Sequence, residues 1–266
     1  ILIGLVGSEM CIRDRAYTIS YNLAGGSLPT GKTNPTTFTI NSKPMDLVQP
    51  KREGYTFEGW SGTDIKEKDT QVTVTARPLK DRTYTANWKE NSYTIVFNVE
   101  GEVTRGEMKN IPLRYTQETT IPENGYVCGG YKFVGWRTGG KKSEQKVYQP
   151  GDKVSRLCAT NNGTVNLYPI WEPCEYTITF DYQTGNKREK VTCKYKETYT
   201  FPTVNRLGWT FEGWSRSAGS TNVISYAPNV KTAVFEDEKD LTLYAVYKPI
   251  TSAVFTGQTE PVSYTH

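Results

Sequence analysis

The stretch GYTFEGW at residues 54–60 decides how this chain is organised, because it returns twice in nearly the same form. It reads GYKFVGW at residues 130–136 and GWTFEGW at residues 208–214, so the spacing is 76 residues and then 78. Self-similarity at a fixed period marks a tandem repeat, in which each copy is one structural unit. The sequence therefore predicts three tandem modules.

Two further words accompany each copy in the same order. An alternating opening word precedes it, as YTISY, YTIVF and YTITF at residues 17–21, 93–97 and 176–180. A closing word follows it, at residues 84–88, 167–171 and 243–247. In the first opening word a period of two puts Tyr17, Ile19 and Tyr21 on one face, which is typical of a half-buried strand.

The order of these words also sets the module boundaries, which we place at residues 16–90, 91–174 and 175–249, followed by a linker at 250–260. A second strand is expected in each module, at residues 36–40, 111–116 and 190–195. In module 3 a turn at Asn186-Lys187 would join the first two strands into a hairpin. A glycine precedes the tryptophan of every central word, at residues 59, 135 and 213, and this position predicts a β-bulge or a close backbone approach.

Composition points to the same fold class. The 266 residues are 36% hydrophobic and 23% charged, and 18 of them are tyrosine. Tyr, Thr and Val are plentiful and long Leu/Ala/Glu stretches are absent, which favours strands over helices. No apolar run approaches ~18 residues, so no membrane span is expected. A net charge of +4 is weak over this length and gives no argument for a nucleic-acid partner. We therefore expect a mainly β protein, α+β at most.

Both ends of the chain resemble a sequencing adapter rather than protein. Residues 10–14, MCIRD, can be encoded by a string whose reverse complement encodes VSYTH, which is residues 262–266. We therefore interpret residues 1–15 and 261–266 as adapter-derived. The only histidine, His266, falls in this part, as does Cys11, which leaves four cysteines. Histidine triads, imidazole metal sites and histidine acid–base chemistry thereby lose their only candidate.

The repeated words are similar to those of a known family. The opening word with its extension to residue 26, the central word and the LYAxY close resemble the Listeria–Bacteroides repeat, which is the B-repeat of internalin-type surface proteins. The resemblance covers essentially all of residues 16–249. It implies a β-grasp-like module, strung in tandem on secreted or wall-attached bacterial proteins as a non-catalytic stalk or adhesive segment. Module 1 closes with YTANW and module 2 is longer, so we expect predominantly β structure rather than the family's helix.

One pattern is typical of nucleotide binding. Residues 26–33, GSLPTGKT, match the phosphate-loop pattern, in which a helix must follow so that its N-terminus can hold the phosphates. Here NPTTFTI follows at residues 34–40, a strand-like run with a proline, and modules 2 and 3 do not repeat the pattern. We expect no nucleotide binding and no cofactor.

Tryptophans and cysteines are the remaining candidate site residues. Five tryptophans hold equivalent places in the copies and are expected to form structural core rather than sugar-stacking platforms, namely Trp60, Trp136, Trp214, Trp88 and Trp171. Trp209 replaces a tyrosine in module 3 and is a better surface candidate. Four cysteines are candidates for disulfides in an exported protein, namely Cys128, Cys158, Cys174 and Cys193. Pairing 128 with 158 and 174 with 193 would keep both bridges within modules, free thiols are the alternative, and no Cys-x-x-Cys spacing supports zinc.

The repeats and the resemblance together predict a non-catalytic segment of an exported bacterial cell-surface protein, acting as a stalk or adhesion module outside the cell. No catalytic, metal or cofactor-binding residue is expected. The expected partners are a host surface protein, a matrix component or a glycan. Two alternatives stay open: a dedicated glycan-binding module, marked by Trp or Tyr exposed in a groove, and accessory repeats of a large secreted enzyme, marked by an adjoining catalytic domain.

Overall fold

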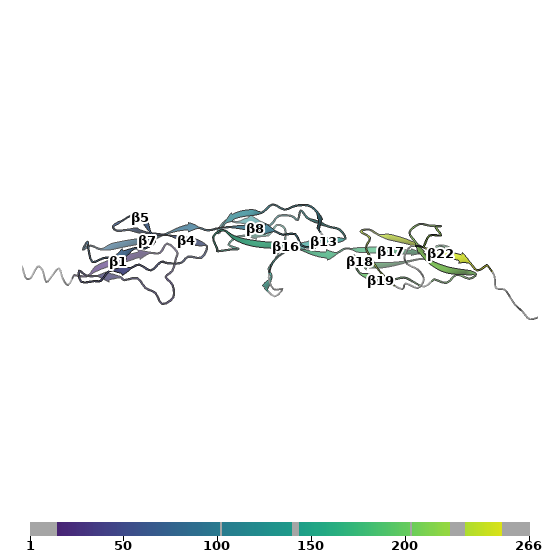
Figure 1. Cartoon of the computed structure of the whole chain (residues 1–266), viewed down its shortest axis with the longest axis horizontal. Coiled ribbons are helices and arrows are strands. Elements are labelled where there is room, and N and C mark those ends of the chain that lie inside the picture. The colour runs from purple at the N-terminus through teal and green to yellow at the C-terminus, as the bar shows by residue number, and fades with distance from the viewer. Residues whose placement is uncertain (1–14, 102, 140–143, 203, 224–231, 252–266) are drawn as a thin grey trace, which may run out of the picture. The chain divides into compact units, whose positions relative to one another are not determined.

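The computed structural model describes residues 15–101, 103–139, 144–202, 204–223 and 232–251, and within these ranges it contains strands and no α-helix (Figure 1). The prediction of a mainly β protein is therefore confirmed. The adapter interpretation of residues 1–14 and 261–266 lies outside the described residues, as does the expected linker beyond Thr251.

Module 1 is built on a five-stranded sheet in the order β2-β1-β7-β4-β5. The strands are β1 (Tyr17–Asn22), β2 (Thr37–Phe38), β4 (Tyr55–Gly62), β5 (Ile65–Asp69) and β7 (Arg82–Glu90). A small second sheet pairs β3 (Met45–Asp46) with β6 (Thr73–Val74).

Module 2 repeats this arrangement in the order β10-β8-β16-β13-β14. The strands are β8 (Ser92–Phe97), β10 (Ile111–Arg114), β13 (Tyr131–Thr138), β14 (Val147–Tyr148) and β16 (Gly163–Pro173). Two small pairs complete it, β9 (Val103–Arg105) with β12 (Val127–Cys128) and β11 (Thr119–Thr120) with β15 (Lys153–Val154).

Module 3 has a four-stranded sheet in the order β18-β17-β22-β20. The strands are β17 (Glu175–Asp181), β18 (Arg188–Lys194), β20 (Trp209–Ser215) and β22 (Leu241–Pro249), and β19 (Thr198–Thr200) pairs with β21 (Thr232–Val234). The expected hairpin is confirmed, since β17 and β18 are antiparallel and the Tyr182 N–H donates to the carbonyl of Lys187 at the turn.

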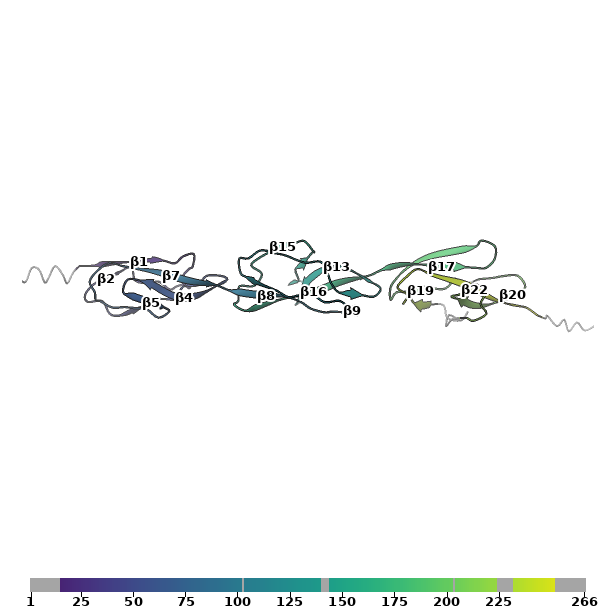
Figure 2. The same ribbon diagram turned by 90° about the horizontal axis from the view of Figure 1, so that it is seen from above.

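One topology is common to the three sheets. The opening strand pairs in parallel with the closing strand at the centre of the sheet, as β1 with β7, β8 with β16 and β17 with β22 (Figure 2). The strand that carries the central word lies antiparallel to the closing strand, as β4 does in module 1 and β20 in module 3. Parallel neighbours require a crossover, and in each module the rest of the chain makes this crossover without a described α-helix.

The bulge predicted at the glycine before the tryptophan is present in modules 1 and 3. Pairing slips between Phe57 and Gly59 in β4 and between Phe211 and Gly213 in β20. Gly59 has a φ of +125°, and a Cβ there would lie 2.7 Å from the backbone of Asp69. Only glycine fits, because both the conformation and the space exclude a side chain.

The residue after the bulge is the centre of each core. Trp60, Trp136 and Trp214 are at most 1% exposed. Phe97 and Phe180, from the opening strands, meet the second and third of these rings at 4.8 Å in edge-to-face geometry. Aromatic pairs of this kind add stability beyond the large area that each ring removes from water. A small β module can in this way be stable around a single tryptophan.

The chain forms two compact units. The first consists of module 1 with residues 91–100, 107–126 and 135–169, and the second consists of residues 101–106 and 127–134 with everything from residue 170 onward. The contacts between consecutive modules described below each lie inside one unit.

Candidate functional site: the module junctions

The turn that leads into β4 is the first part of the candidate site. The Tyr55 N–H donates to the carbonyl of Arg52 at 3.1 Å, and Gly54 between them has a φ of +76°. The Arg52 guanidinium lies 3.7 Å from the centre of the Tyr55 ring, close enough for a cation–π contact. Gly54 therefore closes a tight, positive-φ turn, and its carbonyl is an acceptor for another part of the chain.

This acceptor is used by the residue that follows the closing strand of module 1. The Asn91 N–H donates to the Gly54 carbonyl at 2.9 Å, and the Tyr115 N–H donates in turn to the Asn91 carbonyl at 2.9 Å. Tyr115, which directly follows β10, lays its ring on Gly54, where a Cβ would lie 1.9 Å from the ring. We call the glycine turn the seat, Asn91 the link residue, Tyr115 the capping tyrosine, and the three together the first junction.

Polar side chains tighten the first junction. Asn91 is 6% exposed, and its side chain donates to the carbonyl of Ala159 at 2.7 Å and accepts a hydrogen bond from the Thr56 hydroxyl. The Glu90 carboxylate accepts from both the N–H and the hydroxyl of Thr116, and these bonds lower the pKa of Glu90. Burying a side-chain amide without hydrogen-bond partners is destabilising, and the bonds to Ala159 and Thr56 remove this penalty for Asn91.

The capping tyrosine is also coupled to charge. Burial, and then the neighbouring carboxylate of Glu53, raise the pKa of Tyr115. The Tyr115 ring packs edge to face on the Tyr55 ring at 6.3 Å, so the capping tyrosine contacts an aromatic side chain as well as Gly54. The first junction therefore favours the neutral phenol.

The second junction has the same backbone. Gly130 has a φ of +73°, and its carbonyl accepts from the N–H of Cys174 at 2.8 Å. The carbonyl of Cys174 accepts from the N–H of Tyr195 at 2.9 Å, and a Cβ on Gly130 would lie 2.4 Å from the Tyr195 ring. Tyr195 meets Tyr131 edge to face at 5.3 Å. Seat, link residue and capping tyrosine recur here as Gly130, Cys174 and Tyr195.

The sequence patterns predict neither junction. The second glycine of each central word predicts a bulge, but the first glycine has no predicted role, and Tyr115 and Tyr195 fall within the expected second strands. A signal is present, because the first glycine recurs at every central word and a tyrosine lies at or next to the end of the expected second strand in modules 2 and 3.

The remaining tryptophans are partly covered by the protein itself. The Trp88 indole N–H donates to the carbonyl of Leu23 at 3.0 Å, and a Cβ on Gly26 would lie 2.4 Å from its ring. Trp171 is also half-buried. Trp209 is half-buried, and the Arg206 guanidinium lies 4.3 Å from its ring centre. A groove of about 210 Å³ lies beside Arg206 and Trp209, where the arginine competes with any stacking sugar.

The four cysteines lie in different surroundings, with Cys128 buried on β12 and Cys158 partly buried. Cys174 and Cys193 are thiols in the structure. Cys174 stands beside Tyr195, whereas Cys193 stands opposite Tyr176, so the two cysteines are diagonal across β17 and β18. Diagonal neighbours lie ~7–8 Å apart, with their Cβ atoms somewhat closer, while a disulfide needs Cβ atoms ~3.5–4.5 Å apart. Bridging Cys174 to Cys193 would therefore require the strands to shift, and the disulfides stay a prediction.

The phosphate-loop pattern is followed by strand, as expected. β2 (Thr37–Phe38) comes after it, and the Ser27 N–H bonds to the carbonyl of Lys51 within module 1. The backbone at Gly26 is thus engaged in the fold, and no helix N-terminus is there to hold a phosphate.

The acidic run of residues 236–240 holds module 3 together. Asp237 accepts from Arg216 in a bidentate pair at 2.7 and 2.8 Å, which lowers the pKa of Asp237. Asp240 accepts from the N–H of Thr177 at 2.8 Å. Among the described residues, no group of three or more His, Cys, Asp or Glu could hold a metal ion.

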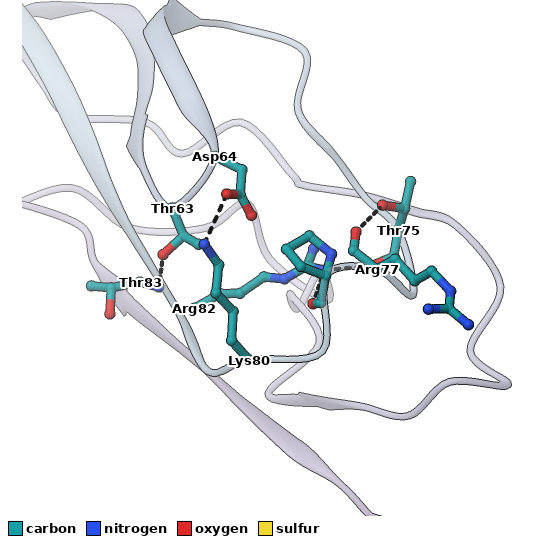
Figure 3. A network of polar contacts seen from close by, with 8 residues as sticks. Thr63, Asp64, Thr75, Arg77, Lys80, Arg82 and Thr83 are labelled. Carbon is teal, nitrogen blue, oxygen red and sulfur yellow. Dashed lines mark hydrogen bonds and ion pairs between the residues drawn. The ribbon is translucent and has the colours of Figure 1, made fainter. Parts of the chain in front are cut away.

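A buried arginine distinguishes module 1 from module 3. Arg82 stands where Leu241 stands in module 3, paired in parallel with the opening strand, and it is 4% exposed. Its guanidinium donates to the carbonyls of Thr75 and Pro78 at 2.8 and 3.0 Å (Figure 3). It therefore ties the loop before β7 to the sheet, which is a structural role.

Comparison with known proteins agrees with the repeat organisation. Two proteins of Evansella cellulosilytica, provisionally named a membrane protein and a Gly-rich membrane protein, are 26% and 24% identical over 86% and 97% of the chain. The chain spans only 31% and 32% of their length. Internalin H of Listeria monocytogenes is 30% identical over 48% of this chain and 22% of its own length.

No helix in the described part of the chain is long and apolar enough to cross a membrane. The similarity to Internalin H and to the Evansella proteins indicates a repeat segment of a surface-type protein. The Listeria-Bacteroides repeat domain matches the chain three times, at residues 17–87, 93–168 and 176–246. These matches cover most of the sequence and coincide with the three sheets, so the chain belongs to the Listeria-Bacteroides repeat family.

Proposed function

We propose that this chain is a non-catalytic stalk segment of an exported bacterial cell-surface protein, which presents other domains outside the cell and can add adhesive contacts. The observation that supports this most is the repeated junction. A single link residue joins consecutive modules, and a tyrosine buried on a glycine seat couples them at both places. A chain of small modules coupled in this way suits a spacer better than it suits a catalyst.

Burial of the capping tyrosine stabilises the contact between consecutive modules. Burying a large side chain stabilises by about 1.5–3 kcal/mol relative to leaving it exposed. Tyr115 and Tyr195 are at most 9% exposed, so each junction gains a contribution of this size besides its backbone hydrogen bonds. Neighbouring modules with short connections and repeated contacts stabilise one another in the manner of repeat arrays.

An adhesive role would use partners on the surface of a host or in its surroundings. We propose a host surface protein, a matrix component or a glycan as the partner class. In this proposal a sugar binds in the Trp209 groove and displaces the Arg206 guanidinium from the face of the Trp209 ring.

The stalk role and the adhesive role are separated by a replacement experiment in the parent protein on the bacterial surface. Residues 16–249 are deleted, or replaced by unrelated β-domains of the same length, and an epitope beyond them is labelled on intact cells. We expect labelling to fall on deletion and to recover with the unrelated spacer, and attachment to host cells to recover with it. Attachment that stays lost while labelling recovers would make the segment an adhesin. An epitope that is never labelled on intact cells would overturn export.

A further inference from the structure

Module 3 carries a third seat. The Trp209 N–H donates to the carbonyl of Arg206 at 3.1 Å, and Gly208 between them has a φ of +79°. The Arg206 guanidinium lies over the Trp209 ring, as Arg52 does over Tyr55 in the first junction. The turn is therefore a close copy of the seat that the first junction uses.

The link position of this third seat is also in place. Ile250 directly follows β22, as Asn91 follows β7 and Cys174 follows β16. Its N–H donates to the Gly208 carbonyl at 3.1 Å, which is the bond that each link residue makes to its seat. The backbone of Ile250 is thus held in the position from which a link residue offers its carbonyl to a capping tyrosine.

The described residues leave this seat open. No described atom lies within 4 Å of a Cβ built on Gly208, whereas the seats at Gly54 and Gly130 are in contact with tyrosine rings. Leu207 is fully exposed and Ile250 is 60% exposed, two apolar side chains beside one open glycine. At the occupied seats the link residues are less exposed, since Asn91 is 6% exposed and Cys174 is half-buried.

We propose that Gly208, Trp209 and Ile250 form a docking seat for a further module of the same repeat, whose capping tyrosine would lie on Gly208 as Tyr115 lies on Gly54 and Tyr195 on Gly130. The argument is continuity with two junctions of this chain that have the same turn, the same link bond and the same glycine conformation. The proposal deepens the stalk function and rests on it, because a spacer gains length by adding modules through one kind of junction.

The test appends a module to the chain in solution. Residues 1–250 are followed by a second copy of residues 92–174, and Ile250→Cys supplies a reporter thiol. Cysteine suits this position, because the second junction uses Cys174 as its link residue. The maleimide labelling rate of the reporter is measured by peptide mass spectrometry, with Cys174 in the same molecule as the reference for a seated link residue.

We expect the reporter to react at least about tenfold more slowly in the extended chain than in the original chain carrying Ile250→Cys, since protection scales with the docked fraction. Two variants of the extended chain should restore fast labelling: Tyr115→Ser in the appended copy alone, which removes the capping ring, and Gly208→Ala, which fills the seat. Gly31→Ala is the matched control for the second, because Gly31 has a φ of +75° with no described atom within 4 Å of an added Cβ.

Equal labelling rates with and without the appended module would overturn the proposal, as would protection that survives both variants. Protection of the reporter in the unextended chain that grows with protein concentration would overturn it too. In that case the seat binds a second copy of the chain. The residue that it would receive is Ile40, because Ile40 follows Phe38 by two residues, and the capping tyrosines follow Leu113 and Cys193, which hold the same register, by two residues. None of these outcomes depends on export, so failure here and failure of the surface role are distinguishable.

Discussion

The first and second junctions share one backbone arrangement but hold their link residues by different chemistry. Asn91 uses its side-chain amide to bond Ala159 and Thr56, so the first junction is a buried polar network. Cys174 has no side-chain amide, yet its backbone N–H and carbonyl make the same two hydrogen bonds as those of Asn91. The glycine seat and the capping tyrosine therefore define the junction, while the link side chain adjusts its strength.

The largest effect should come from filling the seat. We expect Gly54→Ala to lower the free energy of unfolding by about 3 kcal/mol or more, because a Cβ at a positive φ costs ~1–2 kcal/mol and the clash with the Tyr115 ring adds an overpacking penalty. Gly31→Ala, with the same φ and open space, should show the strain alone. Urea unfolding followed by the fluorescence of the chain measures both.

Equal destabilisation of Gly54→Ala and Gly31→Ala would contradict this expectation, because contact with the capping tyrosine would then contribute nothing. Gly130→Ala should resemble Gly54→Ala rather than Gly31→Ala, since its Cβ also meets a tyrosine ring. A chain of several modules can unfold in several steps, so the unfolding transition that a variant shifts is assigned to its module before a free energy is calculated from it.

A smaller effect should separate the two link residues. Asn91→Ala leaves the Ala159 carbonyl without its side-chain donor and is expected to destabilise by about 1–3 kcal/mol. Cys174→Ala keeps both backbone bonds and is expected to change stability by about 0.5 kcal/mol or less. Equal losses in paired thermal unfolding measurements would contradict the view that only the first junction depends on its link side chain.

The smallest effect should be a pH dependence of the first junction. The pKa of Tyr115 is raised in the folded chain, so its contribution is complete below the unfolded value of ~10 and is lost as pH rises through the raised pKa. The pKa of Glu90 is lowered, so its contribution is present above ~4.3 and is lost as pH falls through the lowered pKa. Tyr115→Phe should reduce the alkaline loss and Thr116→Val the acid loss in profiles of melting temperature against pH, and the remaining losses come from other groups such as Tyr182 and Asp237, whose pKa values are raised and lowered respectively. Profiles that match those of the original chain in both variants would contradict a contribution of the first junction to the pH dependence.

Much of the fold was accessible from the sequence because local signals coincide with it. Alternation marked the opening strands, and the glycine before Trp60 predicted a bulge that the structure confirms. The junctions were not accessible, because a capping tyrosine on a strand end has the same pattern as a core tyrosine. Only the three-dimensional register shows that Tyr115 meets Gly54, which is 61 residues earlier in the chain.

Arg82 illustrates another kind of limit. A charged residue at a strand start reads as exposed, yet the fold buries it where module 3 has Leu241. Its carbonyl partners come from a loop whose path no repeat pattern specifies. Sequence words therefore predict what the modules share, whereas the exceptions within a module depend on contacts that arise only after folding.

The parallel pairing of first and last strands has a mechanical consequence. Because the opening and closing strands run side by side in the same direction, tension applied at the two ends of a module pulls them past each other lengthwise. The backbone bonds between them are then sheared together instead of being unzipped one after another. In module 2 the parallel register covers five residue pairs, from Gly163 with Tyr93 to Leu167 with Phe97, against four in module 1 and four in module 3. Single-molecule pulling should therefore find module 2 yielding at the highest force, so that modules 1 and 3 give way before it.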